Sequence, residues 1–229
     1  MAVILNIETS TNVCSVALTA EGTILCHRED FNGQNHATLL SGFIKDCLDH
    51  LRQHELMLEA VAVSIGPGSY TGLRIGLSEA KGLCYALNIP LIGIPTLKIP
   101  CVNVMFGYEV DGTELFAPMI DARRMEVYTA VYDFALDTLV EPTPLILEPG
   151  SFSEFLNKHK VLFFGNGSNK ASDIIKNENA IFVPDIYPLA VDMLPLAEQA
   201  YMKRDFIDLA YSVPVYLKDF QATKPKKMF

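Results

Sequence analysis

A change of hydrophobic period near residue 36 constrains the fold of this chain more than any other feature. Residues 2–8, 13–20 and 23–29 are rich in Val, Ile, Leu and Thr, and only short polar links separate them. Such runs with tight connections predict an antiparallel meander of three strands. Apolar residues then recur at spacings of three and four, which predicts an amphipathic helix over about 36–54.

After this helix, strands and helices alternate. Residues 60–65 read as a short buried strand, a second helix over 72–87 stops at Asn88 and Pro90, and residues 91–94 read as another strand. The order is therefore β-β-β-α-β-α-β over the first ~95 residues. Three meandering strands followed by βαβ crossovers predict an α/β fold, with a mixed sheet and helices on its faces.

The second half follows a composition shift near 95–114, which marks the best lobe boundary. Its expected elements are strands near 115–121 and 125–133, a short helix near 151–158, a strand at 160–164 and a helix over about 190–203. Pro195 indicates a kink or a late start of the last helix. We therefore expect two lobes, residues 1–101 and 102–213, with a C-terminal segment of about 214–229 that can pack back on the first lobe.

The charge balance excludes some classes of protein. The 229 residues include 18 Lys and Arg against 27 Asp and Glu, a formal net charge of −9. An autonomous nucleic-acid-binding protein, or one held on anionic lipid, would show a basic excess instead. No run approaches the ~18 apolar residues that span a bilayer, and the N-terminus reads as a strand rather than a signal peptide. Five scattered cysteines without a CxxC pair favour reduced thiols in a cytoplasmic protein.

A glycine turn joins a strand to a helix within Ser64–Leu83. Gly66 and Gly68 permit a positive φ in a sharp turn, and Ser69 or Thr71 can cap the helix with its hydroxyl. Exposed amides at such a helix start suit a phosphate or a carboxylate. A glycine turn that only caps a helix has the same spacing, so both interpretations stay open, although the spacing is not that of a P-loop.

Small residues repeat every four positions along the second helix, at Gly72, Gly76 and Ala80. They form a smooth groove that lets another helix backbone approach closely. Either the first helix of the same chain or a second subunit can occupy this groove, and the sequence leaves both open.

Polar residues mark two further turns. Glu8, Thr9, Ser10 and Thr11 join the first two strands, where an acid and hydroxyls can contact phosphate or Mg²⁺ or form an ordinary polar turn. Asp121–Glu126 joins two strands of the second half, and its opposed charges predict a solvated hairpin with surface ion pairs.

No catalytic or metal-ligating set can be assembled from the sequence. His36 lies at the start of the first helix, but position 40 is Leu40 rather than a second ligand. The other histidines show no ligand spacing, and no Ser/His/Asp or Cys/His arrangement emerges.

The chain resembles the TsaB family, also called YeaZ, from its first strand to its last. The matching segments are ILNIETSTNVCSVAL (4–18), VSIGPGSYTGLRIGLSEAKGL (63–83), IPLIGIPTL (89–97), PMIDARRMEVYTAVY (118–132) and PVYLK (214–218). The glycine-turn and DARRMEVY segments are specific together. The resemblance implies a two-lobed ASKHA (actin/hexokinase/Hsp70-like) architecture, each lobe a mixed sheet with flanking helices.

The resemblance also implies a function. TsaB is the non-catalytic subunit of the bacterial machinery for threonylcarbamoyladenosine (t6A) in tRNA. It pairs with the homologous TsaD, which holds the metal and the active site, and an ATPase, TsaE, assists them. A threonylcarbamoyl group is transferred to the tRNA adenosine next to the anticodon. By this resemblance we expect the chain to contact tRNA only indirectly, through the complex, and not to associate with a membrane. We expect no intrinsic cofactor, and at most ATP or ADP at the interface with the partner.

In this family the two first-lobe helices form the pairing surface, which also makes a homodimer when the protein is alone. The expected interface residues are Leu40, Phe43, Ile44, Cys47, Thr71, Gly72, Arg74, Gly76, Leu77, Ala80 and Leu83. The candidate nucleotide- or phosphate-binding residues are Glu8, Thr9, Ser10, Thr11, Gly66, Gly68 and Ser69.

Departures from the catalytic relatives favour a supporting role. The catalytic paralogue carries an HxxxH metal motif on the first helix, where this chain has His36 and Leu40. The phosphate turn of ASKHA kinases begins with Asp, whereas here it begins with Glu8, and Gly165–Ser168 lacks their fuller glycine signature. A small ASKHA-type kinase or ATPase is the alternative, and a metallopeptidase is the weakest hypothesis.

Overall fold

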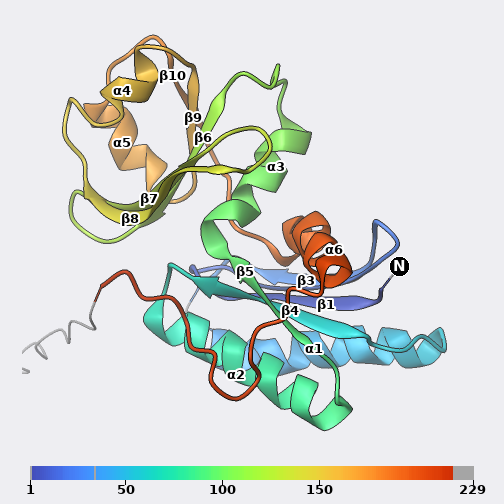
Figure 1. Cartoon of the computed structure of the whole chain (residues 1–229). Coiled ribbons are helices and arrows are strands. Elements are labelled where there is room, and N and C mark those ends of the chain that lie inside the picture. The colour runs from blue at the N-terminus through green and yellow to red at the C-terminus, as the bar shows by residue number, and fades with distance from the viewer. Residues whose placement is uncertain (1, 34, 219–229) are drawn as a thin grey trace, which may run out of the picture.

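Two five-stranded sheets organise the computed structural model, which describes residues 2–33 and 35–218 (Figure 1). The first sheet has the order β3-β2-β1-β4-β5. Its strands are β1 (Ile4–Glu8), β2 (Cys14–Ala20), β3 (Thr23–Asp30), β4 (Ala60–Gly66) and β5 (Leu91–Pro95). β1 pairs antiparallel with β2 and parallel with β4, so the sheet is mixed.

The second sheet has the order β10-β9-β6-β7-β8. Its strands are β6 (Leu115–Asp121), β7 (Glu126–Tyr132), β8 (Thr138–Ile146), β9 (Val161–Phe164) and β10 (Ala180–Val183). Here too an antiparallel meander, β6-β7-β8, is followed by two strands that pair in parallel. The predicted α/β fold with two mixed sheets is therefore confirmed.

Helices cover both faces of the first sheet. Figure 1 shows α1 (His36–Gln53) and α2 (Tyr70–Leu87) on one face and α6 (Leu194–Lys203) on the other. Successive residues of a strand point to opposite faces of the sheet. Leu5 packs in the core under α1 and α2, whereas Ile4 packs in the core under α6. Both faces are thus buried, and every residue of β1 and β2 is buried.

Shorter helices complete the second lobe and the junction. They are η1 (Thr96–Lys98), α3 (Ile99–Gly107), α4 (Ser153–Leu156), α5 (Ser168–Ile174) and η2 (Ala190–Met193). α3 contributes Cys101 and Val104 to the core beneath the second sheet, beside Phe116 and Phe164. The backbone N–H of Ala190 in η2 donates to the Ser15 hydroxyl of β2 at 2.9 Å, so η2 joins the late segment to the first sheet.

The expected elements of the first lobe all form, whereas the second half differs in several places. α3, β8, α5 and β10 were not predicted, and the helix expected near 151–158 is the single turn α4. The last helix begins late, since η2 precedes α6 and Pro195 lies in the first turn of α6. The lobe division at residue 101 remains a prediction and falls within α3.

The C-terminal segment predicted to return to the first lobe is described only as far as Lys218, and the rest of it lies outside the described residues. Within the described residues, Val215 donates its backbone N–H to the Ile65 carbonyl of β4 at 2.7 Å. No helix among the described residues is long and apolar enough to cross a membrane.

Candidate functional site

The hairpin and the glycine turn of the first lobe pack directly on each other. The backbone N–H of Ser69 donates to the Ser10 carbonyl at 2.6 Å. A Cβ on Gly68 would overlap that same carbonyl oxygen, so this close approach requires a glycine. The structure therefore brings together two of the segments that the sequence singled out for phosphate binding.

The Glu8 carboxyl group lies inside this junction and is fully buried. Its Oε1 accepts the backbone N–H of Ser10 at 2.5 Å, whereas its Oε2 has no partner. Burial raises the pKa of Glu8 to about 7, although the Ser10 backbone N–H and the nearby polar side chains of Ser10 and Ser64 partly oppose the shift. Near neutral pH the group therefore exists in both protonation states.

Other polar groups around Glu8 are also buried. The side-chain oxygens of Asn6, Ser10 and Ser64 have no hydrogen-bond partner. An unpaired buried polar atom costs about 1–3 kcal/mol, so this cluster opposes the stability of the lobe unless it finds partners. Thr9 is satisfied, since its hydroxyl donates to the Gly72 carbonyl at 2.8 Å, and Thr11 is buried.

Three amides at the start of α2 are engaged within the chain. Ser69 caps α2, because its hydroxyl accepts the Gly72 N–H at 3.2 Å, while Thr71 lies exposed within the helix. The Leu73 N–H donates to the Ser69 carbonyl at 2.9 Å. The N–H groups of Ser69, Gly72 and Leu73 are therefore not free to meet a phosphate, because the cap and the hairpin already satisfy them. A nucleotide in this half of the site stays a prediction.

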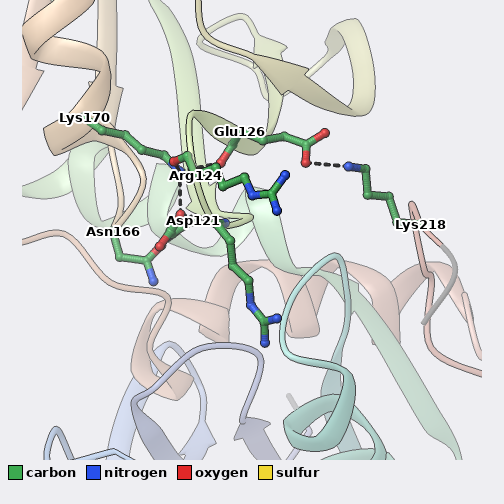
Figure 2. Close-up of polar contacts among 7 residues, drawn as sticks. Asp121, Arg124, Glu126, Asn166, Lys170 and Lys218 are labelled. Carbon is green, nitrogen blue, oxygen red and sulfur yellow. Dashed lines mark hydrogen bonds and ion pairs between the residues drawn. The ribbon is translucent and has the colours of Figure 1, made fainter. Parts of the chain in front are cut away.

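The second lobe builds a similar junction from charged residues (Figure 2). The Asp121 N–H donates to Asn166 Oδ1 at 2.9 Å, which joins the β6–β7 hairpin to the Gly165–Ser168 turn. The Lys170 ammonium of α5 donates to Asp121 Oδ1 at 2.5 Å, to the Arg124 carbonyl at 2.9 Å and to the Glu126 carbonyl at 2.5 Å. The predicted hairpin is present, but the prediction that its own opposed charges pair is wrong for the described residues, because Asp121 pairs with Lys170 and Glu126 with Lys218.

A C-terminal strap, residues 207–218, links the two lobes. Ile207 donates its N–H to the Leu91 carbonyl at 2.9 Å, and the Tyr216 hydroxyl accepts Arg74 Nε of α2 at 2.9 Å. The Arg74 guanidinium also lies 4.0 Å from the ring centroid of Tyr70. At the far end, Lys218 forms an ion pair with Glu126 of the second-lobe hairpin (Figure 2).

Most of the residues expected to meet a partner lie inside the first lobe. Those buried are Leu40, Ile44, Cys47, Gly72, Gly76, Leu77 and Ala80. A Cβ on Gly76 would overlap the Thr9 hydroxyl, so this small-residue stripe fits the chain's own hairpin. Assigning these side chains to a partner contact is therefore wrong. Of the remaining expected residues, Thr71 and Arg74 are exposed, and Phe43 and Leu83 are half-buried.

The outward face of α2 carries a second small-residue stripe that the sequence reading missed. Ser78, Gly82 and Ala86 are exposed and also repeat every four residues. A Cβ on Gly82, or on Gly42 of α1, would meet no atom within 4 Å. The helical pattern alone could have predicted this stripe. The buried stripe lies on the same helix face as Leu73 and Leu77, and a helical turn of about 100° per residue places Gly82 on the opposite side.

The surroundings of His36, the histidine at the start of α1, do not indicate a metal site. A ring nitrogen of His36 lies 3.2 Å from the Val13 carbonyl, and Leu40 is buried in the core. Across residues 2–33 and 35–218, no group of three or more His, Cys, Asp or Glu side chains could hold a metal ion.

Comparisons with known proteins give a consistent result. The family model described as "TsaD: tRNA N6-adenosine threonylcarbamoyltransferase" matches residues 30–226. The chain is 31% identical over 228 residues to the "tRNA threonylcarbamoyladenosine biosynthesis protein TsaB" of Escherichia coli K12, covering 96% of both chains. The protein of the same name from Bacillus subtilis is 33% identical over 141 residues, covering 62% of this chain and 59% of the relative.

A solved structure extends this similarity to the fold. "YeaZ from Pseudomonas aeruginosa" superimposes with a TM-score of 0.78 at 27% identity, covering 95% of this chain and 100% of that one. The similarity therefore includes both sheets rather than one shared lobe.

Proposed function

Because this chain belongs to the TsaB family, we propose that it takes part in the synthesis of threonylcarbamoyladenosine in tRNA, as a non-catalytic subunit in the cytoplasm. The observation that carries this proposal is the match to the Escherichia coli TsaB over 96% of both chains. A match of that extent involves the whole molecule, whereas a shared lobe would support only a shared fold.

Two features of the first helix support the non-catalytic role. The catalytic relatives carry an HxxxH metal motif at this position, and this chain has Leu40 in place of the second histidine. Leu40 is buried, and the ring of His36 faces the Val13 carbonyl. The chain's contribution is therefore to hold and orient a catalytic partner.

The proposed partner is a TsaD-like subunit that packs on the outward faces of α1 and α2. Gly42 and Gly82 are exposed in the middle of these helices, where a glycine costs about 1 kcal/mol relative to alanine. Such positions allow another helix backbone to approach closely. Exposed Thr71 and Arg74 border this surface. A second copy of this chain would use the same surface when the partner is absent.

The net charge of −9 supports an indirect contact with tRNA. A chain that gripped tRNA by itself would need a strongly basic face, because phosphate contacts dominate the affinity. In this proposal the tRNA binds mainly to partners, a TsaE-like ATPase acts on the complex, and any ATP or ADP lies at the interface with the catalytic subunit.

Reconstitution of the modification reaction tests the role. Purified TsaD-like and TsaE-like proteins, with tRNA, ATP and the threonylcarbamoyl donor system, should form threonylcarbamoyladenosine only when this chain is added. Full activity without it would refute the supporting role. ATP turnover by this chain alone, abolished by Glu8→Ala, would instead favour the alternative of a small ASKHA-type ATPase.

The pairing surface has a test of its own, with a matched control. Gly82→Arg places a large cation on the outward face of α2, where a Cβ has open space, so the monomer should stay folded. We expect the complex with the TsaD-like subunit to weaken at least tenfold by light scattering or calorimetry. Gly150→Arg is also in open space but lies in the second lobe, and it should bind normally. Equal affinity of both variants would refute the proposed face.

A further inference from the structure

Two of the five cysteines lie in contact across the first lobe. Cys26 is on β3 and Cys47 is on the buried face of α1, and their Sγ atoms are 3.6 Å apart. Both thiols are free in this structure. A disulfide has an S–S distance of about 2.05 Å, so the two sulfurs need to approach by only about 1.5 Å to bond.

The two thiols differ in accessibility and in charge environment. Cys26 is half-buried, whereas Cys47 is fully buried, and its burial raises the pKa of its thiol to about 12. The Arg28 guanidinium lies 3.9 Å from Cys26 Sγ and forms an ion pair with Asp46 at 2.8 Å. The thiolate is the reactive nucleophile, and oxidants reach an accessible thiol first. Cys26 is thus the accessible member of the pair.

Other cysteines of the chain have different surroundings. Cys84 donates to the Pro90 carbonyl at 3.4 Å, and Cys101 donates to the Leu97 carbonyl at 3.3 Å. Both are buried, and burial raises the pKa of each thiol. Each of these thiols donates to a backbone carbonyl, whereas the Cys47 thiol donates to the Cys26 sulfur. The pair of Cys26 and Cys47 therefore stands apart in the contact between its two sulfurs, and Cys26 also in its access to solvent.

We propose that Cys26 and Cys47 form a redox-active pair that a peroxide oxidises to a disulfide between β3 and α1. The Cys26 thiolate attacks one oxygen of hydrogen peroxide and the O–O bond breaks. The products are a sulfenic acid on Cys26 and hydroxide, which takes up a proton to become water. The Cys47 sulfur then attacks the Cys26 sulfur, the S–O bond breaks, and the hydroxyl group leaves as water with the thiol proton.

The overall reaction converts two thiols and one hydrogen peroxide into one disulfide and two waters. The thiols lose two electrons and the peroxide gains them. The disulfide closes a loop from residue 26 to residue 47, which contains the end of β3 and most of α1. Closing such a loop restricts the unfolded chain, so the oxidised first lobe should resist unfolding more than the reduced one. The inference does not depend on the proposed function.

Peptide mapping after peroxide treatment tests the proposal. The reduced chain is treated with a small excess of hydrogen peroxide, blocked with N-ethylmaleimide and digested. We expect a peptide pair joined through Cys26 and Cys47 that dithiothreitol separates, and a thermal midpoint about 5 °C higher for the oxidised chain. A linked pair that joins other cysteines, or no linked pair with all five thiols blocked, would overturn the proposal.

Two variants distinguish the roles of the sulfurs. Cys47→Ser should stop the reaction at the Cys26 sulfenic acid, which dimedone traps as a stable adduct. Cys26→Ser should form neither the adduct nor the disulfide, and Cys84→Ser, as a control, should oxidise like the natural chain. Circular dichroism confirms the fold of each variant. Disulfide formation in Cys26→Ser at the natural rate would refute the assignment, and the mapping of the natural chain decides the matter if a variant does not fold.

Discussion

The two lobes have one topology but differ greatly in their helices. Listed from its other edge, the second sheet is β8-β7-β6-β9-β10, which repeats the order β3-β2-β1-β4-β5 of the first. The helices at equivalent places differ in length: α1 and α2 have 18 residues each, whereas α4 has 4 and α5 has 7. Topology therefore fixes where a helix is inserted and not how far it extends.

The glycine turns of the two lobes pack alike but differ in the exposure of the acidic residue beside them. In each lobe a glycine turn packs on the hairpin region beside it: a Cβ on Gly68 would overlap the Ser10 carbonyl, and a Cβ on Gly165 would overlap the Met119 carbonyl. The first junction buries the Glu8 carboxyl, whereas the second exposes Asp121 and pairs it with Lys170. The same backbone arrangement thus holds a polar group in two environments, one dry and one solvated.

The largest expected effect tests how tightly the first junction is packed. A Cβ on Gly72 would overlap the Thr9 carbonyl oxygen, and backbone cannot move aside as a flexible side chain can. We expect Gly72→Ala to lower the free energy of unfolding by about 3 kcal/mol, measured by urea denaturation. Gly165→Ala should be comparably harmful in the second lobe, because Gly165 also has a φ of +96°.

A matched substitution on the same helix provides the control. Gly82 has open space around it, so Gly82→Ala should raise the free energy of unfolding by about 0.5–1 kcal/mol. If Gly72→Ala and Gly82→Ala had the same effect, the close contact between α2 and the β1–β2 hairpin would be contradicted.

The second prediction concerns the buried acid. The folded pKa of Glu8 is about 7, above the usual value near 4.3 in an unfolded chain. Between these values the folded state keeps a proton that the unfolded state has lost, so stability falls as the pH rises from about 5 to 8. At 1.36 kcal/mol per pKa unit the loss is about 2–3 kcal/mol. Glu8→Gln cannot titrate and should lose that much less stability over the same range.

Urea denaturation at several pH values checks this difference. Burial also raises the pKa of Asp192 to about 7, so the natural chain contains a second group that acts in the same direction. Asp192→Asn should therefore remove its own share of the pH dependence and retain that of Glu8. An unchanged pH dependence in Glu8→Gln would show that the carboxyl does not titrate inside the folded lobe.

The lobes also differ in how much of them the sequence could predict. The first lobe alternates between clear strand and helix periods, and its expected elements all form. β8 was missed because it contains Pro142 and Pro144, which argue against a strand. An edge strand tolerates proline, and β8 lies at the edge of the described sheet beside β7, so the reason becomes visible once the strand order is known. α5 and β10 are too short for a periodic signal.

The sequence also predicted some features of the candidate site and missed others. The glycine turn and the Glu8 hairpin were found from residue types, and the cap at Ser69 followed from local chemistry. The sequence could not show that the Ser69 amide is already engaged, because the Ser10 carbonyl that accepts it belongs to the β1–β2 hairpin, far from the turn in sequence. The contacts of Lys170 and Lys218 with the second hairpin join residues 44 to 92 positions apart, beyond the reach of a local pattern.

A third and smaller effect tests the solvated junction. Lys170 → Met keeps the length of the side chain but removes the ammonium that donates to Asp121 and to two carbonyls. Because the pair is partly exposed, we expect a loss of about 1 kcal/mol in the free energy of unfolding. The effect should decrease with added salt, unlike that of Gly72→Ala. Insensitivity to salt would mean that packing of the lysine stem, not its charge, holds the hairpin.

The smallest expected effect concerns the strap, which has no counterpart over the second glycine turn among the described residues. Tyr216→Phe removes the hydroxyl that accepts Arg74 Nε but keeps the ring that stacks 4.7 Å from Tyr70. The strap should open locally more often, so hydrogen exchange at the Val215 amide should become about two- to fivefold faster. Amides of β9 in the second lobe should exchange as before. If they accelerated equally, the strap would stabilise both lobes together, and the asymmetry between the two junctions would lie in their turns alone.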